Sequence, residues 1–208
     1  MTIFWDWNGT LLDDVDVCIR CINHLLEARK LPLLSREKYL QIFDFPVKTY
    51  YEKAGFNFKK ESFDDVAEEF MDWYYEYLPE ADLYPESVNI LNGFKSKGYR
   101  QVILSAMEHE SLVKTLKKKG ILPFFDEVAG ISDIYANGKL ESARVLIKKM
   151  NLNGSDNVLI GDTLHDLEVA NDLGLRHILV ADGHQAPQRL LAKTKNVVGR
   201  LTGLYKVL

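Results

Sequence analysis

The chain has 208 residues, of which 47% are hydrophobic and 27% charged, and its formal net charge is -4. This length allows one large domain, or a core with a modest insertion, and is enough to bury a substantial core. The small negative charge argues against a nucleic-acid surface, and no apolar run approaches the ~20 residues of a membrane span. Because the N-terminus also lacks signal-peptide features, we expect a cytoplasmic protein that binds neither nucleic acid nor membrane. The sequence does not indicate an oligomeric state.

The first predicted element is a buried strand that ends in a carboxylate. The apolar residues 3–5 lead into Asp6, and the Asn-Gly-Thr of residues 8–10 is typical of a tight turn. Taken alone, an acidic residue before an Asn-Gly turn is more often structural. In open parallel α/β sheets, however, ligands bind at the carboxyl ends of the strands, which makes Asp6 the first candidate site residue.

Residues 15–83 are predicted to be helical and rich in aromatic residues. Apolar residues recur at helical spacing from Val15 onward, and Asp13 and Asp14 are placed to cap this first helix. Further helices are expected over residues 36–43 and 46–54 and from Ser62 onward. We interpret the aromatic residues as helix-packing core, so this stretch is predicted to be a helical subdomain that packs on another part of the chain.

From residue 84 onward, predicted strands and helices alternate, which indicates a parallel sheet. The strands are expected over residues 101–104, 127–129, 157–160 and 177–180, and the helices over residues 85–97, 109–119, 140–150 and 165–173. Residues 1–14 and 84–208 are therefore predicted to form a doubly wound α/β core, with the helical segment 15–83 inserted after its first strand.

Polar residues follow several of these predicted strands. Ser105 follows the strand of residues 101–104, and Lys139 precedes a predicted helix. Asp162 comes just after the end of a later strand, and Asp166 follows four residues further on. Because the carboxyl ends of parallel strands lie at the same edge of a sheet, Asp162 is expected near Asp6. Clustered carboxylates repel unless a cation joins them, and a few hard oxygen ligands suit Mg²⁺, which keeps several waters and takes a substrate phosphate. A lysine and a hydroxyl nearby would bind the phosphoryl group.

These motifs resemble those of the haloacid dehalogenase superfamily, and the resemblance covers nearly the whole chain. The first family motif, DxDGT, is matched by residues 6–10, with Asn8 in place of the second aspartate. Ser105 matches the second motif, Lys139 the third, and residues 161–166 the fourth, GDxxxD. The helical segment is similar to the cap of the phosphoglycolate phosphatase type. The resemblance therefore implies a hydrolase with a Rossmann-like core and a small α-helical cap.

The resemblance also implies a reaction and a role for each motif residue. The protein would be a Mg²⁺-dependent phosphatase acting on a small phosphorylated metabolite, with Asp6 as the nucleophile that forms an aspartyl-phosphate. Mg²⁺ would be held by the Asp6 carboxylate, the backbone carbonyl of Asn8 and Asp162. Asp166 would not bind the ion directly but would orient Lys139 or a metal-bound water. The residues expected to bind the phosphoryl oxygens are Thr10, Ser105, Ala106 and Lys139.

Asn8 departs from the family pattern, because the family's phosphatases carry an aspartate there that exchanges protons with the leaving group and with water. An amide cannot do so, and general acid-base catalysis contributes ~10²- to 10⁴-fold, so turnover is expected to be slow. Three explanations stay open. In the first, Asn8 is natural and a histidine takes the proton (His109, His165 or His184). In the second, Asn8 was engineered to silence turnover. In the third, the chain is a binding or interaction protein that recognises a phosphorylated ligand.

Two other activities are compatible with a residue other than an acid at position 8. A phosphonatase would need a cap lysine for a Schiff base, for which Lys48 is the candidate, and a dehalogenase would not need the Mg²⁺ site. Both rank below phosphate hydrolysis. His184 follows the last long predicted strand at the same sheet edge and is a candidate ligand contact. Substrate specificity is expected from cap residues around Phe45, Lys48 and Tyr51.

Overall fold

A parallel sheet forms the centre of the computed structural model, which describes residues 1–131, 138–152 and 156–208. Within these residues the sheet has six strands in the order β5-β4-β1-β6-β7-β8. The strands are β1 (Thr2–Trp5), β4 (Arg100–Glu108), β5 (Glu127–Ile131), β6 (Val158–Gly161), β7 (Arg176–Val180) and β8 (Val197–Val198). All their pairings are parallel, so the predicted α/β fold with a doubly wound parallel sheet is confirmed.

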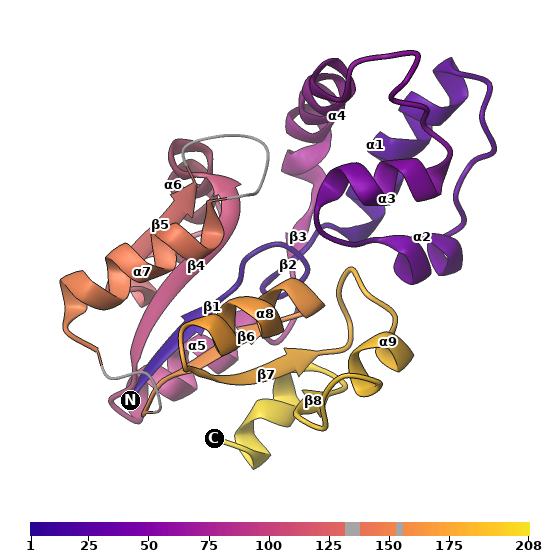
Figure 1. Cartoon of the computed structure of the whole chain (residues 1–208). Helices are drawn as coiled ribbons and strands as arrows, with labels where there is room; N and C mark the ends of the chain where they lie inside the picture. The colour runs from indigo at the N-terminus through magenta and orange to yellow at the C-terminus, as the bar shows by residue number, and fades with distance from the viewer. Residues whose placement is uncertain (132–137, 153–155) are drawn as a thin grey trace.

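Helices cover both faces of this sheet (Figure 1). Successive residues of a strand point to opposite faces, and along β1 Phe4 belongs to one hydrophobic cluster whereas Ile3 and Trp5 belong to the other. The cluster with Phe4 includes residues of α7 (Lys139–Met150) and α8 (Leu164–Asp172). The cluster with Trp5 includes residues of α5 (Ser87–Ser96) and α6 (His109–Lys118). Burial on both faces explains why residues 3–5 of β1 are all apolar.

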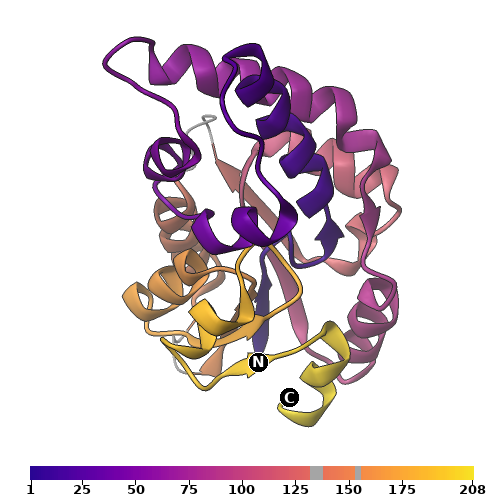
Figure 2. The same ribbon diagram turned by 90° about the vertical axis from the view of Figure 1, so that its right-hand side faces the viewer.

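A group of helices lies between β1 and β4 in sequence and at one end of the sheet in space (Figures 1 and 2). It consists of α1 (Val15–Ala28), α2 (Arg36–Ile42), α3 (Val47–Ala54) and α4 (Phe63–Tyr77), and we refer to it as the helical region. Figure 2 shows both chain termini at the opposite end of the molecule. Ser62 caps α4 as expected, since its hydroxyl accepts hydrogen bonds from the N–H groups of Asp64 and Asp65. The division of the chain into a core and a cap of residues 15–83 stays a prediction.

Three local predictions were wrong. β4 continues to Glu108 instead of ending before Ser105, and its register with β5 is irregular between Leu104 and Glu108. A short antiparallel pair, β2 (Leu12–Asp13) with β3 (Asp82–Leu83), was not expected, because two residues are too few to leave an alternation pattern. Asp14 precedes α1 but does not cap it through its side chain, which has other partners described below.

The remaining helices are short. They are α9 (Pro187–Leu191) and the 3₁₀ helices η1 (Leu78–Glu80), η2 (Leu122–Phe124) and η4 (Leu201–Lys206). Within the three described ranges, every helix is either too short or too polar to cross a lipid bilayer.

Candidate active site

Neighbouring strands bring the predicted acidic residues to one edge of the sheet. Trp5 of β1 is level with Ile160 of β6, and the N–H of the next residue, Asp6, donates to the Ile160 carbonyl at 2.8 Å. Asp162 comes just after the end of β6, and Asp166 lies in the first turn of α8. Carboxylate oxygens of these three aspartates lie within 4.8 Å of one another. The expected convergence of Asp6 with Asp162 is therefore present.

Lys139 is the positive charge of this cluster. Its ammonium lies 2.5 Å from Asp6 Oδ1 and 2.6 Å from Asp166 Oδ1, and the lysine is only 2% exposed. The other oxygen of Asp166 accepts hydrogen bonds from the N–H and the hydroxyl of Thr163, at 3.0 and 2.7 Å. Because both oxygens of Asp166 are engaged, this carboxylate holds Lys139 against Asp6 rather than opening toward a ligand.

Asp162 is fixed by the loops that surround it. Its Oδ1 accepts from the Thr10 hydroxyl at 3.0 Å and its Oδ2 from the His184 N–H at 2.6 Å. The backbone also passes very close: a Cβ at Gly183 would lie 2.2 Å from Asp162 Oδ2, and one at Gly9 would lie 2.4 Å from it. Gly9 has in addition a φ of +69°, which disfavours any other residue. Both glycines are therefore required by the approach of backbone to carboxylate.

The electrostatics of the cluster reflect an excess of buried negative charge. Burial raises the pKa of Asp6 well above its ordinary value, with Lys139 opposing and the two other aspartates adding to the shift. Burial likewise raises the pKa of Asp162, to about 6, against the opposing effect of His184. Burial would also raise the pKa of Asp166, but Lys139 outweighs it and lowers that pKa. Three carboxylates thus share the one ammonium of Lys139, and a divalent cation would balance the negative charge that the ammonium leaves uncompensated.

Asn8 belongs to a second buried network that the sequence did not reveal. Its amide nitrogen donates to Asp14 Oδ2 at 2.8 Å and to the Tyr74 hydroxyl at 2.6 Å. Tyr74 in turn donates to Asp14 Oδ2 at 2.9 Å, and the N–H of Gly9 donates to Asp14 Oδ1 at 2.9 Å. Asp14 therefore accepts hydrogen bonds from the motif turn instead of capping α1. An amide at position 8 is what this carboxylate needs as a neighbour, because a second carboxylate there would repel it.

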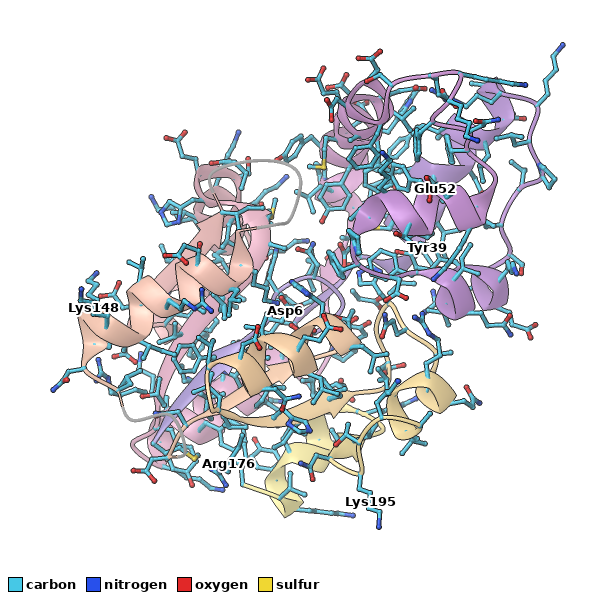
Figure 3. The ribbon with its side chains drawn as sticks, viewed as in Figure 1. Asp6, Tyr39, Glu52, Lys148, Arg176 and Lys195 are labelled. Carbon is cyan, nitrogen blue, oxygen red and sulfur yellow. The ribbon has the colours of Figure 1, made fainter. Side chains whose placement is uncertain are left out.

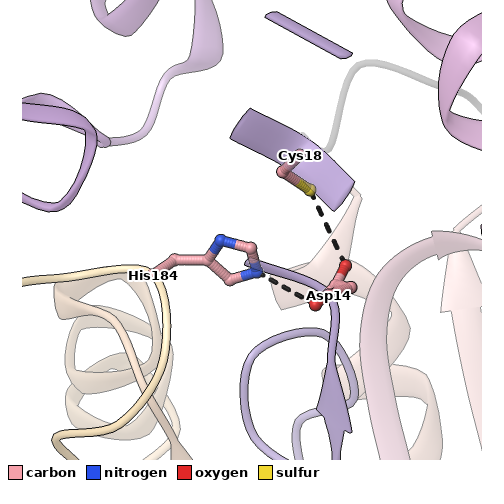
Figure 4. A group of neighbouring side chains, drawn as sticks. All are labelled: Asp14, Cys18 and His184. Atoms are coloured by element: carbon pink, nitrogen blue, oxygen red, sulfur yellow. Dashed lines mark hydrogen bonds and ion pairs between the residues drawn. The ribbon is translucent and has the colours of Figure 1, made fainter. Parts of the chain in front are cut away.

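His184 meets Asp14 and Cys18, which lie at the start of α1, at this network (Figure 4). His184 Nε2 lies 3.1 Å from Asp14 Oδ1, and the Cys18 thiol lies 3.7 Å from Asp14 Oδ2. The other ring nitrogen of His184 contacts the Tyr39 hydroxyl at 2.8 Å. Burial lowers the pKa of His184, but the Asp14 carboxylate outweighs it and raises that pKa to about 9. Burial would raise the pKa of Asp14, but His184 and the hydrogen bonds from Asn8 and Tyr74 outweigh it and lower that pKa. The two groups form a buried ion pair.

A cavity of about 170 Å³ opens above the carboxylates, between the sheet edge and the helical region. Its floor includes Asp6, Asp162 and Lys139, which we call the polar floor. Its opposite side is lined by rings of the helical region, which we call the aromatic wall: Phe43, Phe45, Tyr50, Tyr51, Phe70 and Tyr74. In Figure 3, Asp6 lies at the sheet edge and Tyr39, which also lines the cavity, lies among the helices.

The other predicted site residues fall into two groups. Ala106, His165, His184, Phe45 and Tyr51 line the cavity. The second group is not part of the lining and consists of Thr10, Ser105, His109 and Lys48. Of these, Thr10 supports the floor through its hydrogen bond to Asp162, whereas the hydroxyl of the buried Ser105 accepts a hydrogen bond from the Met107 N–H at 3.0 Å. Lys48 and His109 are exposed on the outside of the molecule.

Asp14, Tyr74 and Tyr39 were not identified as site residues from the sequence. Asp14 carried one available signal, since it is a second acidic residue one turn beyond a motif whose own second acid is absent. The two tyrosines carried none, because aromatic residues at helical spacing are ordinary core residues.

Comparison with known proteins agrees with the family resemblance seen in the sequence motifs. The family model described as haloacid dehalogenase-like hydrolase matches residues 3–180. The chain is 26% identical over 192 residues to the pyrophosphatase PpaX of Bacillus velezensis, covering 91% of this chain and 87% of that protein. It is 25% identical over 190 residues to a phosphoglycolate phosphatase of Caulobacter vibrioides, covering 88% of this chain and 80% of that protein.

The fold is also similar to solved structures. A haloacid dehalogenase-like hydrolase from Streptococcus pneumoniae superposes with a TM-score of 0.76 at 19% identity, covering 99% of this chain and 97% of that one. At 19% identity the structural similarity supports only the fold. The family itself is shown by the family model, which matches most of the sequence. The chain belongs to the haloacid dehalogenase-like hydrolase family.

Proposed function

We propose that this chain is a Mg²⁺-dependent phosphatase that hydrolyses a small phosphorylated substrate through an aspartyl-phosphate on Asp6. The observation that carries the proposal is the polar floor: Asp6 lies at the bottom of a cavity, with its carboxylate 2.5 Å from the Lys139 ammonium and close to Asp162. The names of the relatives, a pyrophosphatase and phosphoglycolate phosphatases, support phosphate chemistry for this floor.

The carboxylates suit a magnesium ion. Asp6 and Asp162 contribute hard oxygen ligands, carboxylate oxygens of the cluster lie within 4.8 Å of one another, and both aspartates have raised pKa values. Few protein oxygens with room for water and phosphate match what Mg²⁺ prefers. We propose the Asp6 and Asp162 carboxylates and the backbone carbonyl of Asn8 as its protein ligands. The bound ion would offset the charge of the phosphoryl oxygens and leave Lys139 to bind one of them.

The reaction proceeds in two displacements. A carboxylate oxygen of Asp6 attacks phosphorus, so that the new O–P bond forms as the bond to the leaving oxygen breaks. Water then attacks the phosphorus of the aspartyl-phosphate, which releases inorganic phosphate and regenerates Asp6. The leaving oxygen gains a proton in the first step, and the attacking water loses one in the second.

Asn8 makes both proton transfers difficult, but not equally so for every substrate. An aryl ester departs as a stable phenolate and needs no acid, so its first step is little affected. The second step still requires removal of a proton from water, and Asn8 cannot accept it. With aryl phosphates, the aspartyl-phosphate is therefore expected to accumulate.

Two alternative functions rest on weaker observations. A phosphonatase would require a lysine in the cavity beside the substrate, but Lys48 is exposed, and its ammonium lies over the Phe58 ring at 5.8 Å from the centroid. A pure phosphate-binding protein is favoured by Asn8 alone. That function requires the same floor but predicts no turnover.

The test is hydrolysis of p-nitrophenyl phosphate by the intact chain, with and without Mg²⁺. We expect slow turnover that requires Mg²⁺ and falls by at least ~10⁴-fold in Asp6→Asn, the change that removes the nucleophile while keeping its shape. Turnover that survives in Asp6→Asn would contradict the proposal. Phosphate binding without any turnover would favour the binding protein.

A further inference from the structure

The aromatic wall is a continuous apolar surface facing the polar floor. Ring centroids lie 5.2 Å apart for Phe43 and Tyr50, 5.3 Å for Tyr50 and Tyr51, and 6.0 Å for Tyr51 and Phe70. Phe45 stacks on His165 at 4.6 Å, which joins the wall to the core side of the cavity. The part of a substrate that extends away from the phosphate therefore meets rings.

Positive charge in the lining is already paired. Lys139 is bound by Asp6 and Asp166, and His184 by Asp14. Among the described residues no arginine and no other lysine lines the cavity. The sequences of residues 132–137 and 153–155 contain neither lysine nor arginine. After the phosphoryl group has been bound by the floor, a second anionic group on the substrate would find no counter-charge in the lining, and removing such a group from water without a partner is costly.

One buried polar atom of the wall has no hydrogen-bond partner among the described residues. The Tyr50 hydroxyl is buried and makes no hydrogen bond within the part of the chain that the structure describes, and Tyr50 is 2% exposed. Because this hydroxyl is itself buried, it offers the cavity no accessible polar group, and Tyr50 meets a ligand through its ring.

From these observations we infer that the substrate is a phosphate monoester whose organic part is uncharged and largely apolar. The inference rests on the proposed phosphatase function and narrows its substrate class. It also separates this chain from the relatives named for phosphoglycolate and pyrophosphate. Phosphoglycolate carries a carboxylate and pyrophosphate a second phosphoryl group, and neither would find a cation on the aromatic wall.

The test compares two esters of the same shape, 4-carbamoylphenyl phosphate and 4-carboxyphenyl phosphate, which differ in one negative charge. With the intact chain and Mg²⁺ near neutral pH, we expect kcat/KM to be at least ~100-fold higher for the carbamoyl ester. Equal kcat/KM for the two esters, with turnover that depends on Asp6, would overturn this inference and leave the proposed function intact. Absence of Asp6-dependent turnover with either ester would overturn the proposed function itself.

A variant adds a test of cause. Met71 lines the same cavity, and Met71→Lys would place an ammonium there on a side chain of similar length. We expect it to reduce the preference for the carbamoyl ester by ~10-fold, whereas Met71→Gln, which is polar but uncharged, keeps the preference. An equal reduction in both variants would show that charge is not the basis of the selectivity, and would overturn the inference.

Discussion

The polar floor and the aromatic wall are built in opposite ways. The floor consists of charged groups at strand ends and helix starts, each with its oxygens or ammonium engaged by neighbours, as for Lys139 with Asp6 and Asp166. The wall consists of rings from the helical region that contact one another, and the buried Tyr50 hydroxyl among them has no hydrogen-bond partner in the described part of the chain. The floor carries the family motifs, whereas the wall carries none. We therefore propose that reaction type and substrate choice depend on different parts of this chain.

The largest expected effect concerns the contact between Asn8 and Asp14. Exchanging the two side chains, as Asn8→Asp with Asp14→Asn, restores an acid at position 8 and keeps one amide and one carboxylate in hydrogen-bond contact. We expect this double variant to hydrolyse p-nitrophenyl phosphate ~10²-fold faster than the parent. Asn8→Asp alone should increase kcat less, because the new carboxylate lies beside that of Asp14 and the repulsion between them raises the pKa of one of the two. The readout is steady-state kcat.

Two controls define this result. Asp14→Asn alone removes the partner of His184 and restores no acid, so it should not accelerate turnover. A double variant no faster than the parent would show that a missing proton-transfer group at position 8 does not limit the reaction. A single Asn8→Asp variant as fast as the double one would show that Asp14 does not constrain position 8.

The next effect tests how closely the floor is packed. In Gly183→Ala the new Cβ would lie 2.2 Å from Asp162 Oδ2, so the loop or the carboxylate has to move. We expect a loss of ~1–3 kcal/mol in the free energy of unfolding, measured by urea denaturation, together with weaker Mg²⁺ binding. Gly199→Ala is the matched control, because no described atom lies within 4 Å of that site. Equal losses in both variants would refute the packing argument.

A smaller effect links Mg²⁺ to pH. In the metal-free protein the pKa of Asp162 is raised to about 6, so its contribution to stability is present at low pH and is lost as the pH rises through that value. Mg²⁺ competes with this proton and should stabilise the protein most above about pH 6. At ~30 times its Kd, Mg²⁺ should add about 2 kcal/mol, or about 4–8 °C in Tm. Thermal melts near neutral pH and near pH 5 should show the shift shrinking in acid, and an equal shift at both would contradict this site.

The smallest expected effect is that of Lys48→Ala. Lys48 is exposed and does not line the cavity, so we expect a change in unfolding free energy within about 0.5 kcal/mol and unchanged kcat/KM for p-nitrophenyl phosphate. A large loss of activity would place Lys48 in the reaction and revive the phosphonatase alternative.

The floor was predictable from sequence because its residues sit at defined points of regular elements. An apolar run that ends in Asp6 and another that leads to Asp162 become neighbours once both runs are strands of one parallel sheet. Lys139 was placed by its motif, and the structure puts it at the start of α7, in contact with Asp6.

The wall and the Asn8 network could not be predicted for the opposite reason. Asp14 and His184 are 170 residues apart in sequence, and neither local pattern requires the contact. An acidic residue before a helix is normally a cap, and only the tertiary arrangement gives Asp14 other donors to accept from. The rings of the wall repeat at the spacing of helix-packing residues, and the sequence does not show which of them also border a cavity.

The most direct test of the proposed reaction is to look for the aspartyl-phosphate on Asp6. The chain is mixed with Mg²⁺ and p-nitrophenyl phosphate, quenched in acid within the first turnover, and analysed by peptide mass spectrometry. Because Asn8 cannot remove the proton from water, we predict a burst of about one p-nitrophenol per active site, with one phosphoryl group on the peptide that contains Asp6. Neither should occur in Asp6→Asn. Steady release of phosphate with no labelled peptide, or a label on a residue other than Asp6, would contradict the account.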